Sequence, residues 1–417
     1  MKLHIENFAK IASADIVFDG LTVIAGANNT GKSTIGKVLY SFYRGQSNVD
    51  RRIAEERVKT VREAFFNVAR VVLSDEECLA VLEGKVEVGS LLREKIRADF
   101  LQEGRDADLS RTERAVADMV QNFGRGIQER VDVARSMPAN QVAWVILRRV
   151  FNCVFHGQYH PLIPSEVNAV VSLRVRNEEN RILFRSDFAE TSFPTRLFAR
   201  AYLVNTPDVL GYMNVRDLEH SSHYARLLDK FVYELAVDLV RERKTSVIAE
   251  AGLDSKLRPV QERLDAIIGG DFKKDSDGGY VFLERGNATP TKVENLSQGM
   301  KALLLLRRMM QKGLLSERDV LVLDEPEVHL HPEWQLVYAH AITVLQRELD
   351  LTVLVTTHSP YFLKALQVYS RRERIGDRTR FYLSRANADG GQCAFDECTS
   401  DLNLAFKSLY EPFARLM

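Results

Sequence analysis

The sequence predicts an α/β fold in which a mixed β-sheet carries flanking helices and is interrupted by a long helical insertion. The apolar segment 21–25 (LTVIA) has the character of a buried strand, and a glycine-rich loop and a segment with helical spacing, 34–40, follow it. Two more apolar segments, 320–323 and 351–356, also resemble buried strands, and each ends in polar residues. The interval 35–295 contains long charged stretches with helical periodicity. Strand, loop and helix in this order are typical of an α/β protein.

The glycine-rich loop, residues 26–33, reads GxxxxGKS. Its glycines allow backbone N–H groups to surround phosphate oxygens, and the following helix N-terminus adds partial positive charge. Lys32 is expected to reach the β- and γ-phosphates, and Ser33 is expected to offer its hydroxyl to Mg²⁺. The predicted nucleotide-binding residues of this loop are Gly26, Asn28, Asn29, Thr30, Gly31, Lys32, Ser33 and Thr34.

A pair of acidic residues closes the strand at 320–323. We expect Asp324 to hold Mg²⁺, directly or through water, and Glu325 to polarise the water that attacks the γ-phosphate. Together with Lys32, Glu325 forms the core of the predicted catalytic set. Loop and acidic strand together predict ATP and Mg²⁺ as cofactors.

Two further segments precede helices. Residues 296–300 (LSQGM) come before a segment rich in helix formers, 301–312, so Ser297 and Gly299 lie at a predicted helix start that can bind an anion. Residues 357–360 (THSP) follow the strand at 351–356 and place His358 at its end.

These motifs carry a resemblance to a known class. LSQGM, just upstream of the acidic strand, resembles the signature motif of ABC-type ATPases. The string 325–332 (EPEVHLHP) resembles that of the OLD-type prokaryotic ABC ATPases, which are cousins of the RecF and SMC ATPases; THSPY at 357–361 and the opening strand at 3–8 resemble the same group. The resemblance covers roughly residues 1–44 and 280–370 at motif level.

The resemblance implies an ABC-type P-loop ATPase head with the helical insertion between the phosphate loop and the signature motif. In this class the signature serine, here Ser297 with Gly299, contacts the γ-phosphate of ATP held by the other subunit. It therefore implies a homodimer that sandwiches two ATP molecules, with assembly beyond a dimer left open. The matching histidine senses the γ-phosphate, which makes His358 the third predicted catalytic residue.

We expect the ATPase head to comprise residues 1–44 and 270–417, with strands from 165–210 added to it. Residues 45–164 and 211–269 are expected to be helical insertion or arm regions, without the sustained heptads of a long coiled coil. Within the added strands, 168–188 predicts a β-hairpin. Its expected parts are a strand at 170–176, a turn at 177–180 and a returning strand at 181–188.

Composition agrees with an ordinary globular protein, since 45% of the 417 residues are hydrophobic and 27% are charged. Lys plus Arg and Asp plus Glu are equal at 57 each, so net charge gives no sign of nucleic-acid binding. No apolar run is long enough to span a bilayer, and the sequence begins directly with a strand-like segment, so we expect no signal peptide and no membrane partner. Four cysteines are too few for a disulfide scaffold, and we predict a cytoplasmic protein.

The leading hypothesis for function is an ATP-dependent dimerising switch. OLD nucleases carry a fused Toprim domain, whereas the segment 359–417 is too short for one. The resemblance therefore implies a separate effector subunit, a nuclease or toxin, in prokaryotic anti-phage defence. A RecF-type repair ATPase that binds DNA stays open as an alternative. So does a stand-alone nuclease effector, although no spacing within 45–290 singles out its catalytic residues.

Overall fold

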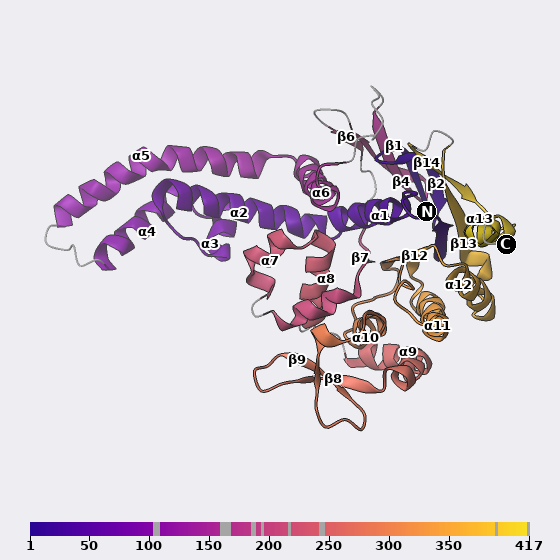
Figure 1. Cartoon of the computed structure of the whole chain (residues 1–417). Helices are drawn as coiled ribbons and strands as arrows, with labels where there is room; N and C mark the ends of the chain where they lie inside the picture. Colours follow the sequence, from indigo (N-terminus) through magenta and orange to yellow (C-terminus); the bar gives the residue numbers. More distant parts are fainter. Residues whose placement is uncertain are drawn as a thin grey trace. The chain divides into compact units, whose positions relative to one another are not determined.

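The computed structural model describes residues 1–102, 109–158, 168–184, 189–192, 196–215, 218–241, 247–387 and 391–414. The chain divides into two units. The first combines Met1–Ser47 with Leu147–Met417, and the second is Asn48–Ile146. Figure 1 labels the α-helices and most of the strands.

The first unit is built on an eleven-stranded mixed sheet with the order β6-β5-β4-β1-β2-β14-β13-β3-β12-β11-β7. Five neighbours at one end, β13-β3-β12-β11-β7, are all parallel, and we call them the parallel half. Their bounds are β3 Leu21–Gly26, β7 Ala201–Val204, β11 Val320–Asp324, β12 Thr352–Thr357 and β13 Thr379–Ala386. Strands β3, β7 and most of β11 and β12 are buried along their length, as expected where helices cover both faces.

Five neighbours at the other end, β6-β5-β4-β1-β2, pair antiparallel, and we call them the antiparallel half. Their bounds are β1 Lys2–Phe8, β2 Ile11–Val17, β4 Ala169–Val175, β5 Glu178–Phe184 and β6 Ala189–Ser192. Strand β14, Cys393–Glu397, joins the halves by pairing parallel to β2 and antiparallel to β13.

The predicted hairpin at 168–188 forms as β4 and β5, but its turn comes earlier than predicted. The chain reverses at residues 176–177, with Arg176 at φ 56°, and 178–180 already pair with 173–175. Asn180 is buried inside β5 and faces Leu173 across the ladder. Polar residues inside the strand therefore resembled a turn. The end of the predicted second strand, 185–188, lies outside the described residues.

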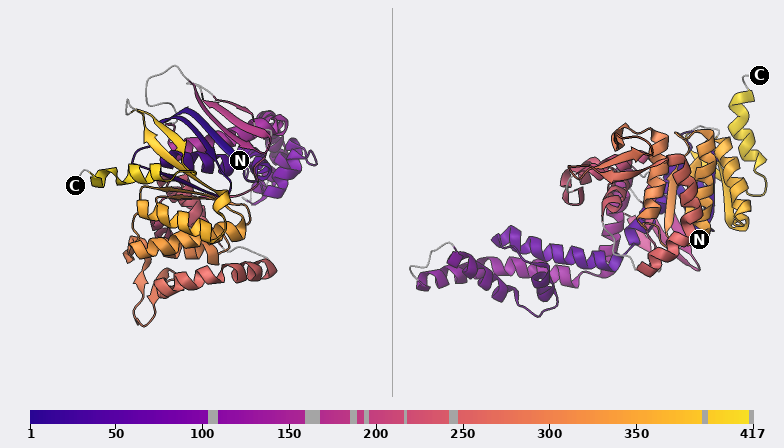
Figure 2. Two further views of the ribbon diagram at one scale, coloured as in Figure 1. Left: turned by 90° about the vertical axis from the view of Figure 1, so that its right-hand side faces the viewer. Right: turned by 90° about the horizontal axis from the view of Figure 1, so that it is seen from below.

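Helices pack on the parallel half of the sheet. Helix α1 contacts β3, β7, β11 and β12, and α11 lies on β12 between α9 and α12, as the stacked helices of Figure 2 show. A small antiparallel sheet, β10-β9-β8, is joined to α10 by Arg307, which donates to the Gly270 carbonyl at 2.9 Å. The bounds of these elements and the remaining ones of this unit are α1 Lys32–Gln46, η1 Pro207–Asn214, η2 Leu218–His220, α7 Ser222–Leu227, α8 Lys230–Val240, α9 Val247–Ile268, β8 Gly270–Lys274, β9 Tyr280–Glu284, β10 Thr291–Lys292, η3 Val293–Asn295, α10 Gln298–Gln311, α11 Pro332–Leu349, α12 Pro360–Arg372, η4 Gly376–Arg378 and α13 Asn403–Ala414.

The second unit is entirely helical among its described residues. Its helices are α2 Val49–Ala69, α3 Asp75–Leu82, α4 Val88–Gln102, α5 Leu109–Ser136 and the first part of α6, Ala139–Phe155. Apolar side chains at helical spacing form its core, including Val61 and Phe65 of α2, Leu92 of α4 and Val131 of α5. A capping box between Ser74 and Glu77 starts α3.

No helix in the described ranges of the chain has both the length and the apolar character that crossing a bilayer requires.

Candidate functional site

The phosphate loop connects β3 to α1, as the sequence predicted for segments 21–40. Gly26 ends the strand at φ +154°, and a Cβ there would meet Ser384 Oγ at 2.2 Å, so only glycine fits. Gly31 caps α1 in the left-handed conformation, at φ 76°, and its carbonyl accepts the Thr34 and Ile35 N–H groups. The loop is therefore bent tightly over the N-terminus of a fifteen-residue helix.

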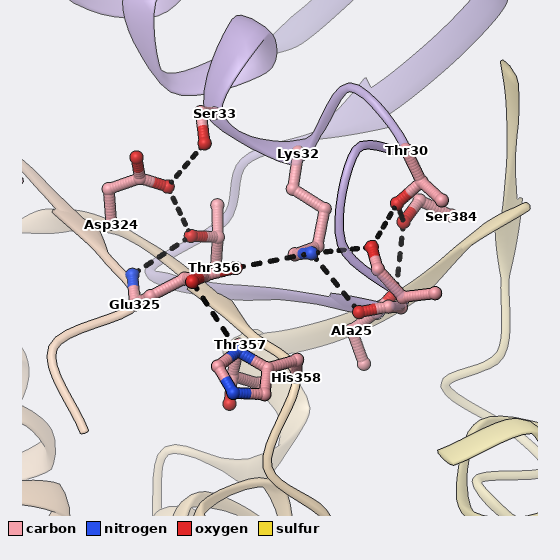
Figure 3. Close-up of polar contacts among 12 residues, drawn as sticks. Ala25, Thr30, Lys32, Ser33, Asp324, Glu325, Thr356, Thr357, His358 and Ser384 are labelled. Carbon is pink, nitrogen blue, oxygen red and sulfur yellow. Dashed lines mark hydrogen bonds and ion pairs between the residues drawn. The ribbon is translucent and has the colours of Figure 1, made fainter. Parts of the chain in front are cut away.

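Lys32 is buried, with 3% of its side chain exposed. Its Nζ donates to the carbonyls of Gly26 at 3.1 Å and Ala27 at 2.8 Å, and lies 3.3 Å from Glu325 Oε1 (Figure 3). A buried ammonium held by carbonyls of its own loop is placed to exchange a carboxylate partner for phosphate oxygens.

Ser33 and Asp324 come together from elements far apart in the chain. Ser33 Oγ donates to Asp324 Oδ1 at 3.0 Å, and Thr356 Oγ1 donates to the same oxygen at 2.5 Å (Figure 3). Thr356 also accepts the Glu325 N–H through both its carbonyl and its hydroxyl, each at 3.1 Å. Strand β12 thus fixes the end of β11, on which both acidic residues depend.

A hydroxyl and a carboxylate are the oxygen ligands that Mg²⁺ accepts. Among the described residues, no group of three or more His, Cys, Asp or Glu side chains could form a complete metal cage. The pair Ser33 and Asp324 therefore fits a Mg²⁺ that takes its remaining ligands from water and phosphate, as this ion commonly does. Their donor chemistry agrees with the prediction, and their metal role stays a prediction.

Glu325 stands between the phosphate loop and His358. Its backbone is left-handed, at φ 49°, and its side chain is partly exposed. One carboxylate oxygen faces Lys32, and the other lies 3.4 Å from His358 Nδ1. The structure therefore brings the three predicted catalytic residues together, with Lys32 and His358 on either side of the Glu325 carboxylate.

Lys32 and Glu325 line a cavity of about 670 Å³, whereas His358 is not among its described lining residues. Predicted residues 28–34, Asp324 and Glu325 line it. Further lining residues come from the β1–β2 turn, the segment after β7, α10, α11 and the loop after β11; they are Ala9, Lys10, Val204, Asn205, Thr206, Pro207, Asp208, Gln298, Ala302, Pro326, Val328, His329 and Tyr338. A volume of this size suits a small-molecule ligand with a polar, charged end.

One ion-pair cluster at this cavity was not predicted. Asp208 accepts from Lys301 Nζ at 2.8 Å and from Gln298 Nε2 at 2.8 and 2.9 Å. Burial alone would raise the pKa of Asp208, but these hydrogen bonds and the nearby cations lower it. The cluster fastens the segment after β7 to the first turn of α10. The apolar strand ending at 204, followed by Asn, Thr and Pro, was the sequence signal that could have pointed to it.

Ser297 and Gly299 are held differently from the other predicted residues. Ser297 is the N-cap of α10, is exposed and accepts from the Met300 N–H at 3.3 Å, and within the described chain neither residue lines the cavity. Gly299 is buried against the loop after β11, where a Cβ would lie 2.6 Å from the His329 carbonyl oxygen. Only a glycine allows this approach.

Three buried residues support the site and were missed from the sequence. Thr356 binds Asp324, as described above. Ser384 of β13 shares a 2.6 Å hydrogen bond with Thr30 (Figure 3). The third, Glu327, accepts a hydrogen bond from Thr357, and burial raises its pKa. Ser384 has no sequence signal because its strand, β13, is far from the phosphate loop along the chain and only pairs with β3 in the fold. Glu327, in contrast, was visible within the 325–332 string.

Two ATPase family models match the chain. One, described as "AAA ATPase domain", matches residues 1–86, and the other, described as "AAA domain, putative AbiEii toxin, Type IV TA system", matches residues 168–364. The first match includes the phosphate loop, and the second includes Ser297, Asp324, Glu325 and His358. The chain carries AAA ATPase domain matches. These matches do not single out the OLD-type branch, which stays a prediction. No protein with a curated description matches the chain.

Three of the solved structures to which the chain aligns are SMC heads. The "SmcHead bound to the C-winged helix domain of ScpA" aligns with 13% identity and a TM-score of 0.43, covering 97% of this chain and 98% of that one. The "SMC head domain from Thermotoga maritima" aligns with 12% identity and a TM-score of 0.37, covering 95% and 97%. The Smc head with an extended coiled coil from Pyrococcus furiosus, bound to the C-terminal domain of ScpA, aligns with 14% identity and a TM-score of 0.41, covering 98% of each chain.

Proposed function

We propose that this protein is a Mg²⁺-dependent ATPase that dimerises on ATP and uses hydrolysis to switch a separate effector. One observation carries the proposal. A buried lysine at the start of α1, two acidic residues at the end of β11 and a histidine after β12 lie together, with Lys32 Nζ 3.3 Å from Glu325 Oε1 and Ser33 Oγ 3.0 Å from Asp324. This is the charge distribution that phosphoryl transfer to water needs.

Each side chain has a definite task in this scheme. Lys32 binds the β- and γ-phosphates in place of Glu325, and the loop N–H groups bind the remaining oxygens. Released from Lys32, Glu325 orients and polarises the attacking water, and His358 beside it contacts the γ-phosphate side. Mg²⁺, when held by Ser33 and Asp324, neutralises developing charge on the phosphates.

The dimer is supported by the position of Ser297. Its hydroxyl lies exposed at the start of a fourteen-residue helix, yet outside the cavity lining of its own chain. An exposed serine on a helix N-terminus is an anion-binding end that a second copy can present to the γ-phosphate. The cavity of one chain is then completed by α10 of another.

The downstream role rests on analogy. One matched family model names a toxin of a type IV toxin–antitoxin system. With the resemblance of the 325–332 string, this supports a role in prokaryotic anti-phage defence with a nuclease or toxin as the effector.

The test combines light scattering with ATPase assays. Glu325→Gln protein should double in mass with ATP and Mg²⁺, because hydrolysis no longer separates the two copies. Adding Ser297→Arg should keep the protein monomeric while ATP binding, measured with a fluorescent analogue, survives, since Ser297 acts on the partner's nucleotide.

Three results would reject parts of the proposal. Wild-type protein that does not hydrolyse ATP would reject the ATPase. Hydrolysis by a protein that stays monomeric in every nucleotide, or loss of ATP binding in monomeric Ser297→Arg protein, would reject the sandwich.

A further inference from the structure

The loop after β11 turns a carboxylate into the protein interior. The left-handed backbone of Glu325 reverses the chain, and the Val328 and Leu330 N–H groups close successive turns on the carbonyls of Glu325 and Glu327 at 3.3 and 2.9 Å. As a result Glu325 stays at the cavity, whereas Glu327, two residues on, is only 2% exposed.

The carboxylate of Glu327 is bound by the residue before His358. Thr357 is fully buried at the end of β12, and its hydroxyl donates to Glu327 Oε1. The same hydroxyl accepts the Ser359 N–H at 3.0 Å. A hydroxyl has one proton and two lone pairs, so Thr357 can donate to Glu327 while it accepts from Ser359.

This chain of hydrogen bonds brackets His358. Thr357 on one side is tied to Glu327, and Ser359 on the other is tied to Thr357 and caps α12 by accepting the Phe362 N–H at 3.1 Å. The ring in between has its Nδ1 3.4 Å from Glu325 Oε2. The buried carboxylate is therefore linked to both neighbours of the ring, to Thr357 directly and to Ser359 through Thr357.

Packing alone does not explain a glutamate at this position. Burying a carboxyl costs free energy that a leucine of similar size would avoid. Its second oxygen, Oε2, has no hydrogen-bond partner within the part of the chain that the structure describes. A residue that is costly to bury and only half satisfied is more readily explained by what it holds than by the stability it adds.

We propose that Glu327 is a positioning residue that holds His358 beside Glu325 through the hydroxyl of Thr357. Its effect on turnover rests on the proposed ATPase function. Its effect on the histidine ring does not.

Four variants separate hydrogen bonding from packing and charge. Glu327→Leu and Thr357→Val each remove one side of the bond at nearly constant volume. Glu327→Gln and Thr357→Ser each keep it, because the amide oxygen still accepts and serine still donates. The matched control is Glu373→Leu, which removes a carboxylate that binds His340 at 2.9 Å on a different part of the unit.

We expect kcat for ATP to fall about 10- to 100-fold in Glu327→Leu and Thr357→Val, with little change in KM, because the catalytic groups are displaced while the groups that bind ATP stay in place. The double variant should lose no more than the worse single one, since both remove the same bond. Glu327→Gln, Thr357→Ser and Glu373→Leu should keep kcat within about threefold of wild type.

An independent readout is the Cε1–H NMR resonance of His358, assigned among the nine histidines with a His358→Gln protein. It should move in Glu327→Leu and Thr357→Val and stay in place in Glu327→Gln and Thr357→Ser. An unmoved resonance in folded Thr357→Val protein, or an unchanged kcat in that variant, would overturn the proposal. If wild-type protein has no ATPase activity the proposed function fails, while the resonance still decides whether Glu327 positions His358.

Discussion

The two halves of the eleven-stranded sheet are built from similar apolar strands but present different edges. In the parallel half, β3, β7, β11 and β12 all end at the same side, so the polar residues that follow them converge. In the antiparallel half, neighbouring strands run in opposite directions, so their ends alternate between two sides. Strand direction, more than residue type, decides which half can assemble a site.

Buried serines make the same contrast on a smaller scale. Ser384 of β13 and Ser172 of β4 are both only 2% exposed, and each makes a 2.6 Å side-chain hydrogen bond. Ser384 bonds Thr30 of the phosphate loop, whereas Ser172 bonds Glu179 of the neighbouring strand. A buried serine thus supports the site in one half and strand pairing in the other.

The largest effect expected from this comparison is on turnover. Glu325→Gln should lower kcat by about 10²- to 10⁴-fold, because the general base is lost while the groups that bind ATP remain. Glu179→Gln of the antiparallel half is the matched control and should leave kcat unchanged. Steady-state ATPase assays give both values, and wild-type turnover in Glu325→Gln would remove Glu325 from the mechanism.

Leu173→Ala tests the other half. Leu173 is fully buried on β4, and its truncation should cost about 2–5 kcal/mol of stability through lost burial and a residual cavity. Thermal unfolding should show a lower Tm, with KM for ATP unchanged in the remaining folded protein. A change in KM would mean that the antiparallel half is coupled to the site.

A smaller and more specific effect is expected for Ser384→Ala. The variant should raise KM for ATP by roughly threefold to tenfold, the equivalent of one hydrogen bond of about 1 kcal/mol, since Thr30 loses its brace. Ser172→Ala should also lose one hydrogen bond of about 1 kcal/mol, but the loss should appear as a lower Tm, with KM for ATP unchanged. Equal KM values for the two variants would contradict the division between the halves.

The smallest effect concerns acid pH. Glu234 of α8 binds Tyr40 and Arg44 of α1 and Lys230, next to the parallel half. Burial alone would raise the pKa of Glu234, but the charges of Arg44 and Lys230 lower it below 4.5. Its folded-state pKa is therefore below its unfolded value, so its contribution to stability is present above about pH 4.5 and is lost as the pH falls through the folded pKa.

Glu234→Gln should therefore flatten the decline in Tm below pH 4.5. The variant is compared with wild-type protein. Melting curves recorded between pH 3 and pH 7 would compare them, with about half-unit steps being sufficient. Parallel curves for wild type and Glu234→Gln would show that this ion network does not contribute.

Local patterns predicted the strands and loops of the site, because the phosphate loop, the acidic pair 324–325 and His358 each follow a continuous apolar segment. Lys32, Glu325 and His358 lie close together because each follows a strand of the parallel half, and these strands end at the same edge of the sheet. What the sequence lacks is information on neighbours distant along the chain. Ser384 lies next to Gly26 only because β13 pairs with β3, and Asp208 meets Lys301 only because η1 packs on α10.

The hairpin turn shows a second kind of failure. Residues 177–180 contain two asparagines and two glutamates, a composition typical of turns, yet three of them belong to β5. Cross-strand pairing with β4 outweighs this local preference, and Asn180 is taken into the core.

The contact at Gly299 has a mechanical consequence. With no side chain between them, the backbone of the first turn of α10 and the carbonyl of His329 are pressed together, so neither can slide past the other without a gap or a clash. A displacement of the loop after β11 should therefore also move Ser297, which caps the same helix. Replacing Gly299 with alanine would push the helix and the loop apart, because the added Cβ would lie 2.6 Å from the His329 carbonyl oxygen.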